Sequence, residues 1–218
     1  DEGLQQIENA RLLVRTGNLQ AAKDAYDKLF KENSPPIDMA VEYWQLVARL
    51  PGQRAAAIRQ LENLDRKTPG YPNLRETLVG LLFDNGENQR AFELLQQMAS
   101  DTSTKETAAG LWLERIKAMP VSKESVARIQ RYLALYDNSA HEQEAKSLLA
   151  EQQKDLANPA FVARQDGLAL VGRGEGARAI PALKKAMADT PNDAQVAAAL
   201  ATAYERAGNR SAAISYYE

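Results

Sequence analysis

The stretch VGRGEGARA, residues 171–179, has the residue types and spacing of a turn that binds a nucleotide phosphate. Gly172, Gly174 and Ala177 fit the G-x-G-x-x-[GA] pattern, in which glycines let the backbone approach a pyrophosphate closely. That chemistry needs a β-strand before the first glycine. The preceding segment PAFVARQDGLALV has helical spacing and no run of β-branched residues, so the flanking sequence argues against a nucleotide site.

Catalytic and metal-binding residue types are scarce in the rest of the chain. His141 is the only histidine, which excludes a two-histidine zinc site, and the absence of cysteine excludes thiolate ligands and cysteine nucleophiles. The acidic residues are scattered, whereas a glycosidase needs two carboxyl groups facing each other across a cleft. We therefore predict that the chain is not an enzyme and has no catalytic, cofactor-binding or metal-binding residues.

Net charge and hydropathy narrow the range of partners. The 27 basic and 29 acidic residues give a formal net charge of -2, which argues against nucleic acid as a partner. There is no apolar run of the roughly 18 residues that a membrane span needs, and no signal-peptide pattern, so we expect no membrane insertion. The sequence ends inside an apolar-periodic segment, SAAISYYE, without a helix stop signal, which predicts a fragment of a longer protein.

Five glycines recur at a nearly constant spacing and organise the chain. They are separated by 35, 34, 88 and 34 residues: Gly17, Gly52, Gly86, Gly174 and Gly208. An alanine follows each glycine by five residues, and a large apolar or aromatic residue follows each alanine by four. This is the tetratricopeptide pattern, a unit of about 34 residues in which two antiparallel helices are joined by a glycine turn. VGRGEGARA is therefore predicted to be an interhelical turn.

The longest glycine interval, 88 residues, contains more than one ordinary repeat. A degenerate repeat is predicted over 104–136, with Ser122 as the N-cap of its second helix. Residues 141–157 have the spacing of one further helix without a partner. Asn158 and Pro159 then provide the N-cap and first position of the next repeat.

The predicted fold is all-α, a tetratricopeptide-repeat superhelical solenoid with one unpaired inserted helix that forms a bend or hinge. We expect a first stack over 1–136, with three recognisable repeats and one degenerate repeat. A linker helix over 137–158 would join it to a second stack over 159–218, with one full and one truncated repeat. Ile214 and Tyr217 would lie on an exposed apolar stripe of that truncated repeat, through which the fragment would self-associate.

Candidate binding residues lie on the first helices of the repeats, which line the concave surface of such solenoids. They are Glu42, Tyr43, Arg49, Glu76 and Phe83. Tyr43 also falls on an apolar stripe with Met39, Leu46 and Leu50, beside that of Trp44, so burial between helices is the alternative for this residue. An ordinary solvent-exposed position is the alternative for the others.

Four stretches of the chain resemble the N-terminal repeat region of the BcsC family of bacterial cellulose synthase proteins. They are AVEYWQLVARLP (40–51), GLLFDNGENQRAFELLQQMA (80–99), MPVSKESV (119–126) and EQQKDLANPAFVARQDGLALV (151–171). The degenerate MPVS unit and the lone helix before NPAF are the most specific elements, because both depart from the repeat consensus.

The resemblance implies a periplasmic location and a role in bacterial cellulose export during biofilm formation. In that family, periplasmic repeats are followed by a C-terminal outer-membrane barrel, which this sequence lacks, and the whole exports the glucan made by an inner-membrane synthase. The implied partners are the other subunits of the cellulose synthase complex, with cellulose or peptidoglycan as further candidates.

Three roles remain open for the repeats. A scaffold would link the synthase to the export pore through protein-protein contacts, whereas a carbohydrate-binding solenoid would guide the nascent β-1,4-glucan along a row of exposed aromatic side chains. A generic peptide-binding tetratricopeptide protein is the third possibility. The low aromatic content, 6%, favours the scaffold.

Overall fold

The computed structural model describes residues 1–217, and Glu218, the last residue of the predicted second stack, lies outside the described residues. All regular secondary structure in this part of the chain is helical, as predicted. The helices are α1 (Glu2–Arg15), α2 (Leu19–Leu29), α3 (Ile37–Ala48), α4 (Arg54–Lys67), α5 (Pro72–Asp84), α6 (Asn88–Met98), α7 (Lys105–Ala118), α8 (Lys123–Leu135), α9 (Glu142–Ala157), α10 (Pro159–Gly172), α11 (Gly176–Asp189), α12 (Ala194–Arg206) and α13 (Arg210–Tyr217). None of the helices within 1–217 has the length and apolar character that crossing a membrane would require.

The chain divides into two compact units. The first unit comprises Asp1–Arg115 and Ala134–Glu142, and the second comprises Ile116–Leu133 and the chain from Gln143 onward. Helices α7 and α8 each contain residues of both units. The residues of the predicted linker, 137–158, are likewise shared between the two units.

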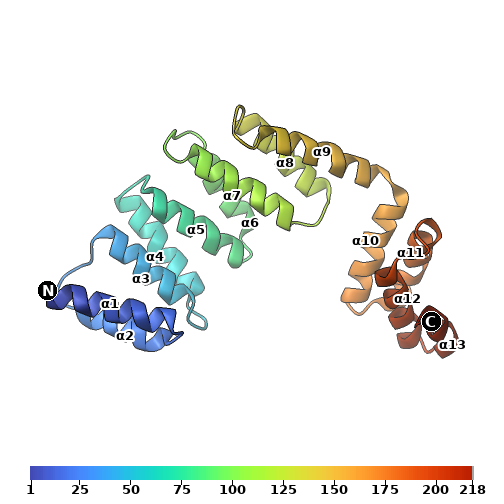
Figure 1. Ribbon diagram of the computed structural model, residues 1–218, viewed down its shortest axis with the longest axis horizontal. Helices are drawn as coiled ribbons and strands as arrows, with labels where there is room; N and C mark the ends of the chain where they lie inside the picture. Colours follow the sequence, from blue (N-terminus) through green and yellow to red (C-terminus); the bar gives the residue numbers. More distant parts are fainter. Residues whose placement is uncertain (218) are drawn as a thin grey trace. The chain divides into compact units, whose positions relative to one another are not determined.

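Helix hairpins build the first unit. Figure 1 shows α1 beside α2, α3 beside α4, and α5 beside α6, each pair antiparallel and joined by a short turn. The first helices of neighbouring repeats also pack against each other, as α3 does against α5. The alanine and aromatic positions of the repeat pattern form the interior, where Ala22 and Tyr26 are fully buried.

A chain of aromatic rings continues this interior into the degenerate repeat. Phe92 lies edge-on to Phe83 at 5.2 Å and to Trp112 at 4.8 Å, measured between ring centroids. Trp112 in turn contacts Tyr136 at 5.8 Å. The hydroxyl of the fully buried Tyr136 donates a hydrogen bond to the carbonyl oxygen of Leu95 at 2.7 Å, so this ring is fixed by both packing and hydrogen bonding.

The stretch VGRGEGARA forms a tight turn around Gly174. Gly174 has φ +80°, a conformation that favours glycine, and it closely follows the end of helix α10. Its N–H donates to the carbonyl oxygen of Val171 at 3.0 Å, and the N–H of Glu175 donates to that of Leu170 at 2.8 Å. The stretch is thus the turn between α10 and α11, and the predicted interhelical turn is confirmed.

Predicted caps are also confirmed in the second unit. Asn158 accepts a hydrogen bond from the N–H of Ala160 at 3.0 Å, and Pro159 occupies the first turn of α10. At the start of α8, the Ser122 hydroxyl oxygen accepts the N–H of Ser125 at 3.1 Å, and the Ser125 hydroxyl oxygen accepts the N–H of Ser122 at 2.9 Å. These reciprocal bonds satisfy amide groups that a helix start leaves without partners.

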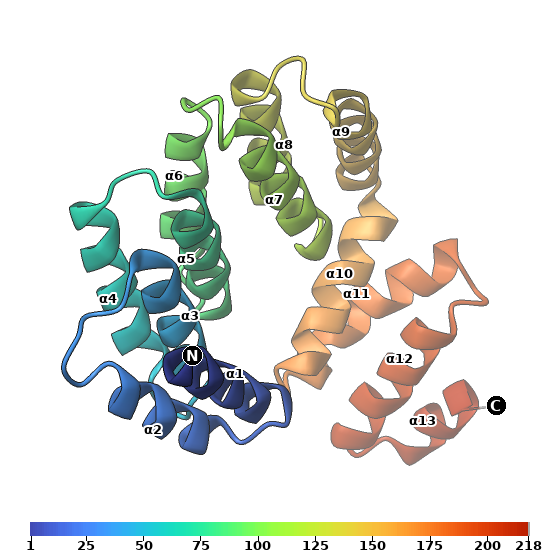
Figure 2. The same ribbon diagram turned by 60° about the vertical axis from the view of Figure 1, so that its left-hand side comes forward.

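Helix α9 is attached to α8 by the same serine. The Ser125 hydroxyl donates to Oε1 of Gln152 at 2.6 Å, and both side chains are buried. Ala145 on α9 is also fully buried. Helix α10 contacts the segment before α8, because Nε2 of Gln165 donates to the carbonyl oxygen of Val121 at 3.0 Å. Helices α10 to α13 then pack as successive neighbours (Figure 2).

The contact between α10 and α11 depends on a missing side chain. A Cβ atom added at Gly167 would lie 2.6 Å from Cδ2 and 2.7 Å from Cγ of the fully buried Leu183, and 3.3 Å from the backbone nitrogen of that residue. Gly167→Ala should therefore lower the free energy of unfolding by about 1–2 kcal/mol, after a helix-propensity gain of up to about 1 kcal/mol. Chemical denaturation of the purified chain measures this change.

Gly172→Ala is the matched control, because Gly172 lies on the same helix and an added Cβ would meet no atom within 4 Å. It should leave stability unchanged or raise it by up to about 1 kcal/mol. Equal effects of the two substitutions would show that the close packing at Gly167 is not a constraint.

Candidate functional site

A hollow of about 420 Å³ lies between the first helices of the first two repeats. Each helix contributes one stripe of side chains, since the positions on α1 and on α3 are spaced by three or four residues. The lining residues are Arg11, Val14, Arg15, Glu42, Gln45, Leu46 and Arg49. We call this surface the arginine hollow.

Glu42 ties three helices together at one wall of the arginine hollow. Its carboxylate accepts hydrogen bonds from Arg11 on α1, with Nε to Oε1 at 2.7 Å and Nη2 to Oε2 at 3.0 Å. The hydroxyl of Tyr26 on α2 donates to Oε1 at 2.6 Å. Arg11 also contacts Glu8 at 2.9 Å. Glu42 is thus engaged within the fold, which leaves little of its carboxylate for a ligand.

The charge states in this cluster are set by the same contacts. The hydrogen bonds from Arg11 lower the pKa of Glu42, the bond from Tyr26 acts in the same direction, and partial burial opposes both. Burial raises the pKa of the Tyr26 hydroxyl, and its bond to Glu42 raises it further. At neutral pH the cluster therefore holds a carboxylate, a neutral phenol and a guanidinium.

Two other arginines of the hollow are unpaired. Within residues 1–217, neither Arg15 nor Arg49 has a hydrogen bond or ion pair, and both side chains are exposed. Arg15 is the last residue of α1, and Arg49 is the C-cap of α3. The amide nitrogen of Gln45 donates to the Thr77 hydroxyl at 2.7 Å, so this amide group is held in place by α5.

Repeat symmetry relates several of these residues. Arg15, Arg49 and Phe83 are spaced by 34 residues, as are Glu8, Glu42 and Glu76. Arg15 is not among the contact residues predicted from the sequence. Its spacing of 34 residues from Arg49 is the sequence signal that identifies it. No comparable signal marks Arg11 as the partner of Glu42.

Tyr43 lies away from the arginine hollow. Its hydroxyl donates to Oδ1 of Asp27 on α2 at 2.5 Å, and its ring is edge-on to Trp44 at 4.8 Å and to Tyr26 at 6.2 Å. Tyr43 is half-buried and packs against the core that contains Met39 and Leu46. Tyr43 thus packs between helices and also lines a hollow together with Phe30 and Trp44, and its role as a contact residue stays a prediction.

Phe83 and Glu76 occupy separate places on α5. The half-buried Phe83 ring is covered by the guanidinium of Arg115 at 4.7 Å from the ring centroid. Glu76 is exposed and has no hydrogen bond or ion pair to any residue of the described chain. Of the five candidate contact residues, Glu42 and Arg49 share the arginine hollow, and the other three do not line it.

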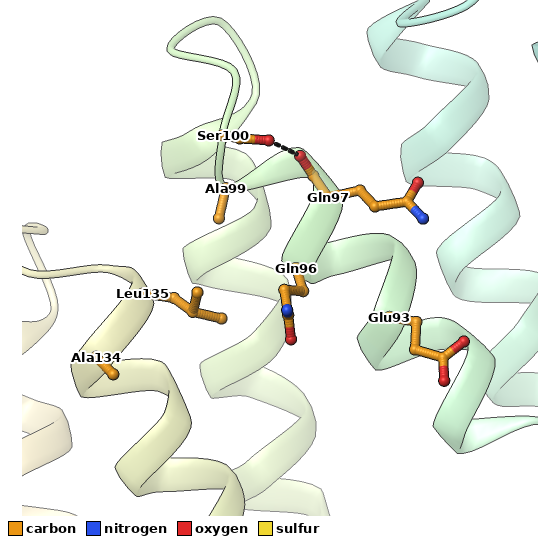
Figure 3. Close-up of a pocket in the computed structure, with 7 residues that line it drawn as sticks. All are labelled: Glu93, Gln96, Gln97, Ala99, Ser100, Ala134 and Leu135. Atoms are coloured by element: carbon orange, nitrogen blue, oxygen red, sulfur yellow. Dashed lines mark hydrogen bonds between the residues drawn. The ribbon is translucent and has the colours of Figure 1, made fainter.

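A second hollow, of about 640 Å³, lies between α6 and the end of α8. Figure 3 shows that Glu93 and Gln97 extend to one side of α6, while Ala134 and Leu135 lie on the other side. The Ser100 hydroxyl donates to the carbonyl oxygen of Gln97 at 2.7 Å. Because these polar groups diverge, the arginine hollow offers the better-defined binding surface.

The aromatic side chains are mostly enclosed. Among the described residues, Tyr217 on α13 is the one aromatic side chain that is largely exposed, with 63% of its surface accessible. Ile214 beside it is 56% exposed, as predicted, and self-association through these two residues stays a prediction. Three half-buried aromatic side chains, Phe30, Tyr43 and Trp44, line a separate hollow of about 360 Å³. Within 1–217 no group of three histidine or acidic side chains could hold a metal ion.

Related proteins match this sequence along its whole length. No protein-family model matches the chain. Cellulose synthase operon protein C of Escherichia coli (strain K12) is 40% identical over 217 residues, which is 100% of this chain. The counterpart in Salmonella typhimurium is also 40% identical, over 91% of this chain. The chain belongs to the BcsC family of cellulose synthase operon proteins. The predicted resemblance is confirmed.

A solved structure of the BcsC family has the same fold. The crystal structure of the flexible tandem repeat domain of bacterial BcsC is 44% identical, with a TM-score of 0.62, and the match covers 72% of this chain and 65% of that one. The chain spans about a fifth of the length of its curated relatives, 19% of the Escherichia coli protein.

The contribution of Glu42 can be measured against Glu76, its equivalent one repeat later. Glu42→Gln removes the carboxylate that Arg11 and Tyr26 bind and should lower the free energy of unfolding by about 1–2 kcal/mol at neutral pH, as expected for partly exposed charged hydrogen bonds. Glu76→Gln removes an unpaired carboxylate and should change stability by less than about 0.5 kcal/mol. Denaturant unfolding of both variants tests this difference.

The effect of Glu42→Gln should depend on pH. The pKa of Glu42 is lower in the folded chain than its ordinary value of 4.5, so its carboxylate stabilises the fold above that pH. This stabilisation is lost as the pH falls through the folded-state pKa, which lies below 4.5. The stability difference from wild type should therefore shrink in acid, and a difference that does not change with pH would contradict an electrostatic role.

Proposed function

We propose that the chain is part of a periplasmic repeat scaffold for the export of bacterial cellulose. The scaffold links the inner-membrane synthase to the outer-membrane export pore through protein-protein contacts, with peptidoglycan as a further surface to which it docks. The cellulose context is supported by 40% identity over the whole chain to cellulose synthase operon protein C.

The docking role is supported by the arginine hollow, which is lined by unpaired arginines and by no aromatic side chain. The first helices present unpaired Arg15 and Arg49 beside a hollow, a surface suited to charged partners. A glucan guide needs stacking platforms for sugar rings, whereas no aromatic side chain lines the arginine hollow, and Phe30, Tyr43 and Trp44 in the separate hollow are each only partly exposed. Docking therefore fits the described surface better than polymer guidance.

Two measurements separate docking from glucan guidance. Calorimetric titration of the purified chain with cello-oligosaccharides, up to millimolar sugar, should give no saturable heat. Chemical cross-linking of the full-length protein in cellulose-producing cells should join exposed lysines of this chain, such as Lys28 and Lys67, to subunits of the synthase complex. Saturable sugar binding without such cross-links would contradict the scaffold and support the glucan guide.

A joint over 137–158 is the second part of the proposal. It is supported by the broken glycine period and by the sharing of these residues between two compact units. The related crystal structure is described as a flexible tandem repeat domain. A joint would let the scaffold change its span during export.

Spin labels test the joint directly, since the sequence has no native cysteine to interfere. Labels at Lys28→Cys and Lys185→Cys, one in each unit, should give a broad distribution of distances by pulsed electron resonance. The control pair, Lys28→Cys with Lys67→Cys, lies inside the first unit and should give a narrow distribution. Equally narrow distributions for both pairs would rule out a joint.

A further inference from the structure

We propose that the arginine hollow binds an acidic peptide segment of a partner protein, in which carboxylate side chains alternate with aliphatic ones. This inference deepens the docking role proposed above and rests on it, since it assigns the chemistry of one docking site. It does not depend on cellulose as the exported polymer.

The arginine hollow has a net positive charge. Three arginines and one glutamate line it, and Glu42 is already bound by Arg11 and Tyr26. Arg15 and Arg49 therefore keep their full positive charge without a partner in the described chain. The C-termini of α1 and α3 each carry about half a unit of negative charge, which reduces the attraction to an anion but does not cancel it.

The nearest acidic residue along α1 does not neutralise Arg15 either. Glu8, which contacts Arg11, precedes Arg15 by seven residues on α1, or about 10 Å along the helix axis. That separation is about one Debye length at 0.1 M salt, and Glu8 is well exposed, so its field is largely screened at Arg15. The guanidinium groups are thus available to a carboxylate, which they can bind in a bidentate manner.

The arginine hollow also has an apolar part. Val14 is half-buried and lies with the almost fully buried Leu46 among the lining residues, so Val14 offers apolar surface to an aliphatic side chain. No aromatic side chain lines the hollow, which disfavours stacking of a sugar ring. A ligand that satisfies both parts has carboxylates beside aliphatic groups.

The side-chain amide of Gln45 favours a peptide backbone over an isolated anion as the ligand. Its nitrogen already donates to Thr77, which fixes the orientation of the amide group. Its oxygen remains a hydrogen-bond acceptor, and a peptide N–H is a matching donor. The volume of about 420 Å³ is in the range of ligand-binding clefts and suits a short segment rather than a folded domain.

A pair of synthetic peptides tests this chemistry on the purified chain. The probe is a capped peptide in which two leucines alternate with two glutamates, and its control replaces both glutamates by glutamines. By calorimetry the acidic peptide should bind at least about tenfold more tightly, and raising the salt concentration should weaken its binding. The Nε–Hε signals of Arg15 and Arg49 should move in nuclear magnetic resonance spectra as the acidic peptide is added.

Arginine variants locate the site. Arg15→Gln and Arg49→Gln should each weaken binding of the acidic peptide about fivefold to tenfold, with little change in thermal stability, because both residues are exposed and unpaired. Arg59→Gln is the matched control, since Arg59 is an exposed and unpaired arginine on α4 that does not line the hollow. It should leave binding within about twofold of wild type.

Several results would overturn the inference. The glutamine peptide would bind as tightly as the glutamate peptide, or Arg59→Gln would weaken binding as much as Arg15→Gln and Arg49→Gln. Inorganic phosphate would displace the bound peptide at a lower concentration than unlabelled peptide does. Cello-oligosaccharides would bind, and Arg15→Gln and Arg49→Gln would abolish that binding. If peptide binding fails while the full-length protein still cross-links to synthase subunits, the docking role stands and docking occurs elsewhere. Loss of both would remove the proposed function as well.

Discussion

Mutual burial of short helices is the constraint on which the rest of this structure depends. The helices are between 8 and 16 residues long, a length at which a helix is marginal in water without partners. Each helix is therefore ordered by the next, through fully buried positions such as Ala22, Tyr26 and Leu61. Stability is a property of neighbouring pairs, and a weak contact at one pair affects its neighbours before the rest of the chain.

This constraint also shapes the arginine hollow. A first helix must contact its own second helix and the neighbouring first helix, so only a narrow stripe stays open. On α1 and α3 that stripe carries Arg15 and Arg49, one repeat period apart, with Leu46 at its base. The spacing of the backbone positions that carry the two arginines is thus set by the packing of repeats.

Local features can be predicted from the sequence where a requirement of the backbone favours one residue type at one position. The turn at Gly174 and the caps at Ser122 and Asn158 follow from backbone requirements, and they are found as predicted. The side-chain partners of the candidate site could not be predicted in this way. Glu42 binds Arg11 and Tyr26, which are 31 and 16 residues distant, and that choice depends on how three helices meet.

The tie between Arg11, Tyr26 and Glu42 has a consequence for the order of the repeats. One period later Glu76 has no such partners, because Gln45 and Leu61 stand at the positions that correspond to Arg11 and Tyr26. Stacked repeats of similar shape could in principle exchange neighbours, within one molecule or between two. Because this polar contact is present at one interface and absent at the next, a wrong pairing of repeats would leave Arg11 or Glu42 without its partner. The contact therefore favours the correct pairing of these two repeats and disfavours misassembly at this interface.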